Sequence, residues 1–154
     1  MKKKTVIDFM KMKKQRDQVA WITAYEYLTA SYAEQAGMDM VLVGDSMGMV
    51  LLGYDSTMPV TMDDCISHCQ AVRRGAPHTW VVGDMPFLSY QQSDEAAVIN
   101  AGRFFKEAGV DCIKLVGGQR VASRIKAIAD SGMPVMGHIG LTPQSSGQLG
   151  GFVV

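Results

Sequence analysis

Short apolar runs alternate with longer amphipathic segments along the whole chain. The runs are rich in valine, isoleucine and other large apolar residues, which is the pattern of buried strands in a parallel sheet. The segments between them have helical spacing, and several end at a glycine. The predicted strands are 19–24, 40–44, 80–83, 110–115 and 133–137, and the helices between them end near residues 36, 75, 108 and 131.

Residues at the segment ends support these boundaries. Gly37 stands where a left-handed residue closes the first of the intervening helices. Thr61 supplies a hydroxyl N-cap, and Asp63 and Asp64 place acids in the positive first turn of the next helix. The polar stretch 45–59 is predicted as a long loop, and the glycine-rich stretch after residue 143 as a tail without a further helix.

An additional helix is predicted before the first strand, over residues 6–18. Ile7, Met10 and Lys14 share one face of it, which predicts that the helix packs under the domain. A helix lying on a membrane surface is the alternative for this mixed apolar and basic segment.

The regular alternation of strand and helix predicts a parallel sheet with right-handed crossovers. Two architectures fit, an open doubly wound sheet and a (β/α)₈ barrel. A barrel needs eight units and about 250 residues, whereas the pattern over these 154 residues contains five. The prediction is therefore a single domain over residues 1–154, made of the leading helix and βα units 1 to 5.

Composition narrows the functional classes. Lys plus Arg and Asp plus Glu each total 15, so the balanced charge predicts neither nucleic-acid binding nor attraction to an anionic membrane. The basic start is not followed by the apolar stretch of a signal peptide, and no apolar run is long enough to span a bilayer. A cytoplasmic protein is expected.

The three cysteines have no framework spacing and are expected to be reduced. Cys65, His68 and Cys69 would share one helix face, which resembles part of a metal site. A closed zinc site requires a fourth ligand that the sequence does not identify. The favoured interpretation is a buried helix in which cysteine is a small core residue.

Two of the predicted strands end in the same way. Val43-Gly44-Asp45 and Val82-Gly83-Asp84 each place an aspartate at the carboxyl end of an apolar run, where parallel α/β folds keep their chemistry. If the two strands are neighbours, Asp45 and Asp84 lie close together. Paired carboxylates suit Mg²⁺, which leaves its other positions to water and substrate oxygens. Each acid could instead be an ordinary turn or helix-capping residue.

Two further residues are candidates for the same edge. Lys114 is an ammonium within an apolar run, so it must pair with an anion or lose its charge. It is either the structural partner of an acid or the anchor for a substrate carboxylate. His138, after the fifth strand, is a possible donor to a substrate oxygen or a hydrogen-bonded core histidine. No glycine-rich nucleotide-binding motif follows any strand.

Several blocks together resemble the ketopantoate hydroxymethyltransferase family, in order and over nearly the whole chain. The blocks are Ile22-Thr-Ala-Tyr25, Val41-Leu-Val-Gly-Asp-Ser-Met-Gly48, Gly53-Tyr-Asp-Ser-Thr-Met-Pro-Val60, Ala71-Val-Arg-Arg-Gly-Ala-Pro77, Gly83-Asp-Met-Pro-Phe87 and Gly137-His-Ile-Gly-Leu-Thr-Pro-Gln-Ser145. The resemblance implies a (β/α)₈ barrel of the phosphoenolpyruvate/pyruvate superfamily, assembled as a homo-oligomer. It implies transfer of the one-carbon unit of 5,10-methylenetetrahydrofolate to 3-methyl-2-oxobutanoate, which gives 2-dehydropantoate for pantothenate and coenzyme A synthesis.

The resemblance also implies roles for individual residues. Asp45 and Asp84 match the family's Mg²⁺ carboxylates. Asp45, Ser46, Asp84 and Lys114 match its contacts to the 2-oxo acid, Lys114 balancing negative charge and Ser46 orienting the acid. Mg²⁺ would act as a Lewis acid that stabilises an enolate.

The chain departs from the family pattern in three places. Val116 stands where the family has the third carboxylate of the metal site. Ser146-Gly147 and Val153 replace a Val-Asn pair and a Lys. The family's general base, a glutamate after the sixth strand, falls beyond Val154, so we expect the 154-residue chain to be inactive alone and to self-associate.

Two alternatives to the hydroxymethyltransferase remain at this point. One is another Mg²⁺-dependent lyase or mutase of the same superfamily that acts on a 2-oxo acid. The other is a non-catalytic remnant. The blocks at 53–60 and 137–145 favour the hydroxymethyltransferase, because they resemble that family specifically.

Overall fold

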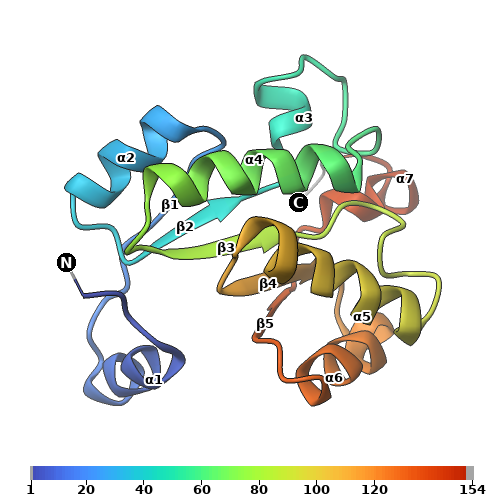
Figure 1. Cartoon of the computed structure of the whole chain (residues 1–154). Coiled ribbons are helices and arrows are strands. Elements are labelled where there is room, and N and C mark those ends of the chain that lie inside the picture. The colour runs from blue at the N-terminus through green and yellow to red at the C-terminus, as the bar shows by residue number, and fades with distance from the viewer. Residues whose placement is uncertain (1, 152–154) are drawn as a thin grey trace.

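The computed structural model describes residues 2–151, which form one parallel sheet and the helices that cover it (Figure 1). The strands run in the order β1-β2-β3-β4-β5. They are β1 (Trp21–Thr23), β2 (Met40–Val43), β3 (Trp80–Asp84), β4 (Cys112–Val116) and β5 (Val135–His138). The α-helices are α1 (Val6–Gln15), α2 (Tyr27–Gln35), α3 (Met47–Val50), α4 (Met62–Gly75), α5 (Asp94–Arg103), α6 (Ala122–Asp130) and α7 (Ser146–Leu149).

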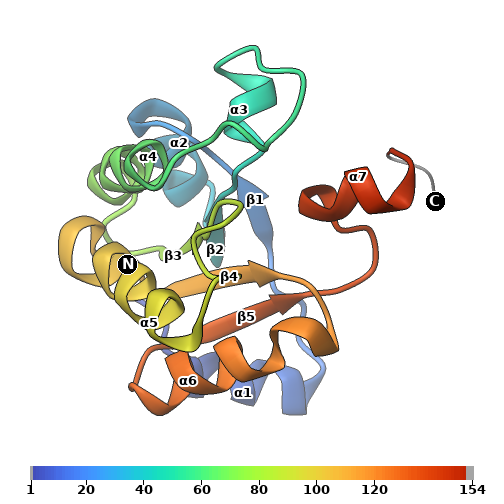
Figure 2. The ribbon, with the colours of Figure 1, turned by 90° about the vertical axis from the view of Figure 1, so that its right-hand side faces the viewer.

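The sequential strand order decides between the two predicted architectures. Strands that pair with their neighbours in the sequence, through crossovers of one hand, place all the crossover helices on one face of the sheet. Figure 2 shows α2, α4, α5 and α6 around the outside of a curled sheet. A doubly wound sheet would have helices on both faces. The described fold is therefore five consecutive units of a (β/α)₈ barrel.

All five predicted strands are confirmed, but two helical segments were not predicted. Helix α3 occupies part of the stretch expected to be a loop, and α7, preceded by a 3₁₀ turn at Pro143–Ser145, lies in the tail expected to lack a helix. Both α-helices have four residues. That length is too short to produce a readable 3.6-residue pattern. Both lie beyond the carboxyl ends of the strands (Figure 1).

The strands alternate their side chains between two cores. One set of side chains, which includes Val41, Val81 and Ile113, points toward the outer helices and belongs to the main core. The other set points toward the inside of the curled sheet and forms a second, smaller apolar cluster. Its buried members are Met40, Trp80, Val82 and Cys112, and Phe9, Leu42 and Met136 pack against them. The inner face is thus apolar near the amino ends of the strands.

Helix α1 covers this apolar end of the inner face, below the sheet in Figure 1. The Phe9 ring meets the Trp80 ring edge to face, with centroids 5.3 Å apart. Lys3 and Lys4 form ion pairs with Asp111 and Asp39, the residues just before β4 and β2. The helix packs under the domain as predicted.

The face of α1 that makes this contact differs from the predicted one. Ile7 and Met10 are exposed, and Phe9 is the residue that packs against the sheet. The helix is also shorter than predicted, because Arg16 adopts a left-handed conformation (φ 62°) that ends it.

Gly83 allows the outer helices to approach β3 closely. A Cβ at this position would lie 2.7 Å from Cδ1 of Phe104, which begins a π-helical turn at Phe104–Ala108 after α5. The phenylalanine ring therefore packs directly on the backbone beside Asp84 and fixes the carboxyl end of β3.

In the part of the chain that the structure describes, no helix is long and apolar enough to cross a membrane.

Candidate active site

A pocket of about 560 Å³ opens at the carboxyl ends of the strands, at the opposite end of the inner face from α1. It brings together every residue singled out from the sequence as a site candidate, from the ends of β2, β3, β4 and β5. They are Asp45, Ser46, Asp84, Lys114 and His138, with Val116 beside them.

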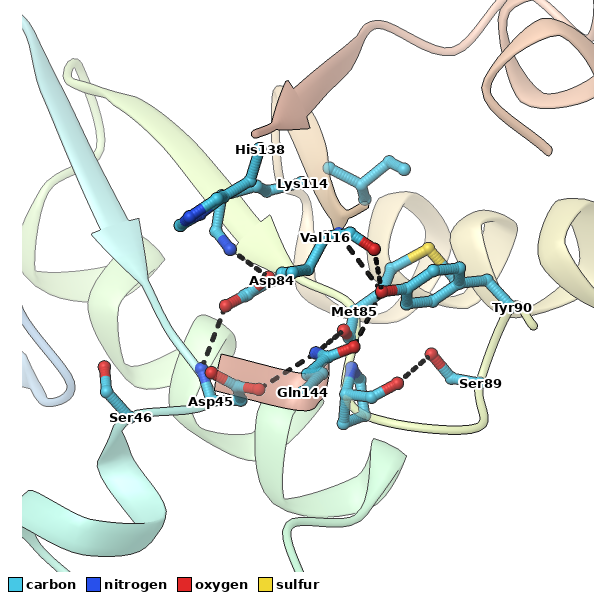
Figure 3. A network of polar contacts seen from close by, with 12 residues as sticks. Asp45, Ser46, Asp84, Met85, Ser89, Tyr90, Lys114, Val116, His138 and Gln144 are labelled. Atoms are coloured by element: carbon cyan, nitrogen blue, oxygen red, sulfur yellow. Dashed lines mark hydrogen bonds and ion pairs between the residues drawn. The ribbon is translucent and has the colours of Figure 1, made fainter. Parts of the chain in front are cut away.

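Strand register explains this convergence. Asp84 pairs in register with Lys114, and Val116 with His138. These four positions continue the inner face whose earlier positions are apolar, so their side chains point into the barrel interior (Figure 3). Asp45 and Ser46 enter from the turn between β2 and α3.

Asp84 and Lys114 form a buried ion pair. Nζ of Lys114 lies 2.7 Å from Oδ1 of Asp84, and the two residues are 6% and 2% exposed respectively. Within residues 2–151 the Lys114 ammonium is the only partner of this oxygen. Burial raises the pKa of Asp84 from 3.8 to about 7, despite the opposing effect of Lys114. The predicted pairing of Lys114 with an acid is confirmed.

Asp45 is held by one contact to its backbone and one to its side chain. Its N–H donates to Oδ2 of Asp84 at 3.2 Å, which ties the two carboxylates together. Its own Oδ2 accepts a hydrogen bond from Nε2 of Gln144 at 2.9 Å. Among the hydrogen bonds of the described residues, none involves Oδ1 of Asp45 (Figure 3).

The other two candidates are also held in place. The Ser46 hydroxyl lies 2.9 Å from the Tyr25 hydroxyl, in a hydrogen bond that either group can donate. Nε2 of His138 lies 2.7 Å from the Leu141 carbonyl oxygen, so Nε2 carries a proton and donates it. In a neutral ring Nδ1 is then an acceptor. The proposed donation from His138 to a substrate oxygen therefore requires the protonated imidazolium.

Two residues at this edge were not predicted from the sequence as site residues. Gln144 reaches from the 3₁₀ turn after β5, and Tyr90 from the loop after β3. The Tyr90 hydroxyl contacts Gln144 Oε1 at 2.6 Å and both backbone polar groups of Val116, at 2.8 and 3.1 Å. Gln144 belongs to a block that carried the family resemblance, but nothing in its local pattern indicated its partner.

The oxygen groups at this edge fit a hard divalent cation. Asp45 Oδ1 is not hydrogen-bonded in the described chain, and the buried Asp84 Oδ1 has only an ion-pair partner. Mg²⁺ prefers one or two carboxylates with its remaining positions taken by water and substrate oxygens. Residues 2–151 contain no cluster of three or more His, Cys, Asp or Glu side chains that could hold a metal, so these two carboxylates would act without a third.

On α4, Cys65 and Cys69 belong to the main core, and His68 is partly buried beside them. Cys65 and Cys69 are fully buried, and burial raises the pKa of each thiol far above its usual range. Nδ1 of His68 lies 2.5 Å from the Tyr25 carbonyl oxygen. The interpretation of these residues as a buried helix face is confirmed.

Comparison with solved structures places the fold in a known group. A phosphoenolpyruvate phosphomutase from Streptomyces platensis subsp. rosaceus matches with a TM-score of 0.68 and 16% identity, over 87% of this chain and 53% of that one. A 2,3-dimethylmalate lyase, described as a PEP mutase/isocitrate lyase superfamily member, matches with a TM-score of 0.64 and 15% identity, over 85% and 51%. At these identities the likeness is one of fold.

Comparison of sequences is more specific. A 3-methyl-2-oxobutanoate hydroxymethyltransferase of Alkaliphilus metalliredigens is 76% identical over 98% of this chain and 54% of its own length. The protein of the same name from Heliobacterium modesticaldum is 54% identical over 99% and 55%. The chain thus spans about half the length of these curated relatives. The family model described as ketopantoate hydroxymethyltransferase matches residues 3–154. The chain therefore belongs to the ketopantoate hydroxymethyltransferase family.

Proposed function

We propose that this chain forms the 2-oxo-acid and metal side of a hydroxymethyltransferase active site. The reaction would transfer the one-carbon unit of 5,10-methylenetetrahydrofolate to 3-methyl-2-oxobutanoate and give 2-dehydropantoate. The names of the relatives support the reaction class. The observation that carries the proposal is the convergence of Asp45, Ser46, Asp84 and Lys114 on one pocket at the carboxyl ends of the strands.

Asp45 and Asp84 would hold Mg²⁺ in this proposal. Bound there, the ion would supply Lewis-acid polarisation of the substrate's keto oxygen. The Asp84 carboxylate now has the Lys114 ammonium as its countercharge, 2.7 Å away. A cation at Asp84 provides the same countercharge, so Lys114 becomes free to pair with the carboxylate of the 2-oxo acid.

The remaining residues would orient the substrate. Ser46 can donate to a substrate oxygen while its Oγ accepts from the Tyr25 hydroxyl, which fixes the direction of the Ser46 proton. His138 would donate through Nδ1 when it is protonated, because Nε2 donates to Leu141. The apolar side chain of Val116 lines the same pocket.

A polypeptide of these 154 residues should bind 3-methyl-2-oxobutanoate in the presence of Mg²⁺ without forming product. Binding requires the pocket residues described above, whereas proton removal requires a positioned base. The base implied by the family resemblance is a glutamate beyond Val154. Calorimetry would measure the binding, and a folate-dependent assay of 2-dehydropantoate would measure turnover.

Ser46→Ala and the exposed-surface variant Ser123→Ala make a matched pair for this experiment, because only Ser46 lines the pocket. Binding that is absent, or equally strong in both variants, would argue against the assigned pocket. Product formation by these 154 residues would contradict the prediction, because it would show that a base is present within them.

Val116→Glu should tighten Mg²⁺ binding by about tenfold, because a third carboxylate adds negative charge to the site. Position 116 shares the inner face of β4 with Lys114, two residues away, so the new side chain enters the same pocket. Calorimetric titration with MgCl₂ would measure the change. Ile99→Glu, at an exposed position of α5, adds the same charge elsewhere and should leave the affinity unchanged. Equal affinities for Val116→Glu and the parent would refute the third-carboxylate argument.

A further inference from the structure

The side-chain amide of Gln144 uses all of its hydrogen-bonding capacity. Nε2 donates to Oδ2 of Asp45 at 2.9 Å and to the Met85 carbonyl oxygen at 3.0 Å. Oε1 lies 2.6 Å from the Tyr90 hydroxyl, whose single proton can go either to Oε1 or to the Val116 carbonyl oxygen, and it accepts from Nε2 of Gln91 at 3.2 Å. Gln144 is only 7% exposed, so water does not compete for these contacts.

These partners fix the orientation of the amide. A Gln144 side chain turned by 180° would direct Oε1 at two acceptors, the Asp45 carboxylate and the Met85 carbonyl. Tyr90 is fully buried and is itself held by the backbone of Val116 (Figure 3). The Nε2 protons of Gln144 therefore face Asp45.

This contact makes the two oxygens of Asp45 unequal. Oδ2 lies beside an amide N–H, whose partial positive charge repels a cation, whereas Oδ1 is not hydrogen-bonded to any described residue. A cation is consequently directed to Oδ1, and Asp45 offers one oxygen rather than two. Ca²⁺ takes six to eight oxygens and commonly binds carboxylates through both, whereas Mg²⁺ requires a compact octahedron of single oxygens.

We propose that Gln144 determines metal specificity by restricting Asp45 to one-oxygen ligation, which favours Mg²⁺ over Ca²⁺. Gln144 would not touch the ion and would act through Asp45 as a positioning residue. This inference rests on the Mg²⁺ site proposed above. It assigns a role to a residue of the β5–α7 segment that the site candidates did not include.

Gln144→Leu tests the inference, because leucine has nearly the same size and no amide. The 154-residue chain is titrated by calorimetry with MgCl₂ and, separately, with CaCl₂. We expect Mg²⁺ affinity to fall by about tenfold, the lower end of the range for residues that orient metal ligands. Ca²⁺ affinity should fall less, because Asp45 is then free to bind through both oxygens, so the ratio of the two affinities drops several-fold.

Gln148→Leu is the matched control, because Gln148 is exposed and contacts Arg120 rather than Asp45. Circular dichroism establishes that each variant is folded, and Gln144→Met replaces Gln144→Leu if the latter is not. Tyr90→Phe leaves both Nε2 contacts of Gln144 in place and should change the ratio less than Gln144→Leu does.

The outcomes separate the two proposals. A Mg²⁺/Ca²⁺ affinity ratio that is the same in Gln144→Leu and Gln148→Leu would overturn the role of Gln144 and leave the metal site intact. Equal weakening of both ions would also overturn it, because that is what a purely structural role predicts. A parent chain that binds neither ion would overturn the Mg²⁺ site and this inference together.

Discussion

Without divalent cations, the free energy of unfolding should fall as the pH rises from about 4 to about 7. The pKa of Asp84 is 3.8 in its ordinary state and about 7 in the folded chain. Between these values the folded state binds the proton that the unfolded state has lost. The stabilisation is therefore fully present below pH 4 and is lost as the pH rises through 7, a loss of about 4 kcal/mol.

Urea denaturation in EDTA at a series of pH values measures this loss. Asp84→Asn should remove most of the dependence, whereas Asp63→Asn, at an exposed position of α4, should retain it. Asp8, Glu26, Asp64 and Glu107 have lowered pKa values, so their contributions have the opposite sign and are complete once the pH reaches about 5.5. The fall in stability above that pH therefore reports Asp84. A parent chain of constant stability from pH 4 to 7, or an unchanged slope in Asp84→Asn, would contradict the prediction.

Lys114→Met should destabilise the chain by about 3–5 kcal/mol at pH 8, because it leaves the ionised Asp84 carboxylate buried without a countercharge. The loss should be smaller at pH 5, where Asp84 is protonated and needs no partner. Denaturant unfolding at the two pH values measures both effects.

The double variant Lys114→Met/Asp84→Asn has no buried charge at this position, so it should lose less stability than the sum of the two single variants. Lys126→Met is the control, because its ion pair with Asp130 is exposed and contributes less than about 1 kcal/mol. Additive effects at Lys114 and Asp84 would show that the two side chains are not coupled.

The order of strands and helices was predictable because each follows from a local pattern. The β-branched runs fix the five strands, and capping residues such as Thr61 fix helix starts, as its capping box with Asp64 demonstrates. The choice between an open sheet and a barrel was not predictable from these patterns. It depends on which strands are neighbours, and local spacing carries no information about that.

The same distinction applies to the site. Asp45, Asp84 and Lys114 were predictable because strand ends of a parallel sheet meet at one edge, and a lysine in an apolar run requires an anion. Gln144 was not, since it lies in the segment after β5 and meets Asp45 across 99 positions of sequence. An uncharged polar side chain in a loop has no pattern that distinguishes burial from exposure.

The packing of α1 under the sheet has a consequence for the order of assembly during synthesis. The helix leaves the ribosome before the strands, yet Phe9 packs on Trp80, and Lys3 and Lys4 just before the helix pair with Asp111 and Asp39. A ten-residue helix is only marginally stable by itself. Asp111, the partner of Lys3, is synthesised about a hundred residues later, and bringing the two ends of this long segment together has an entropic cost. Although α1 precedes every strand in the sequence, it is therefore expected to dock on the sheet only after β2, β3 and β4 have paired.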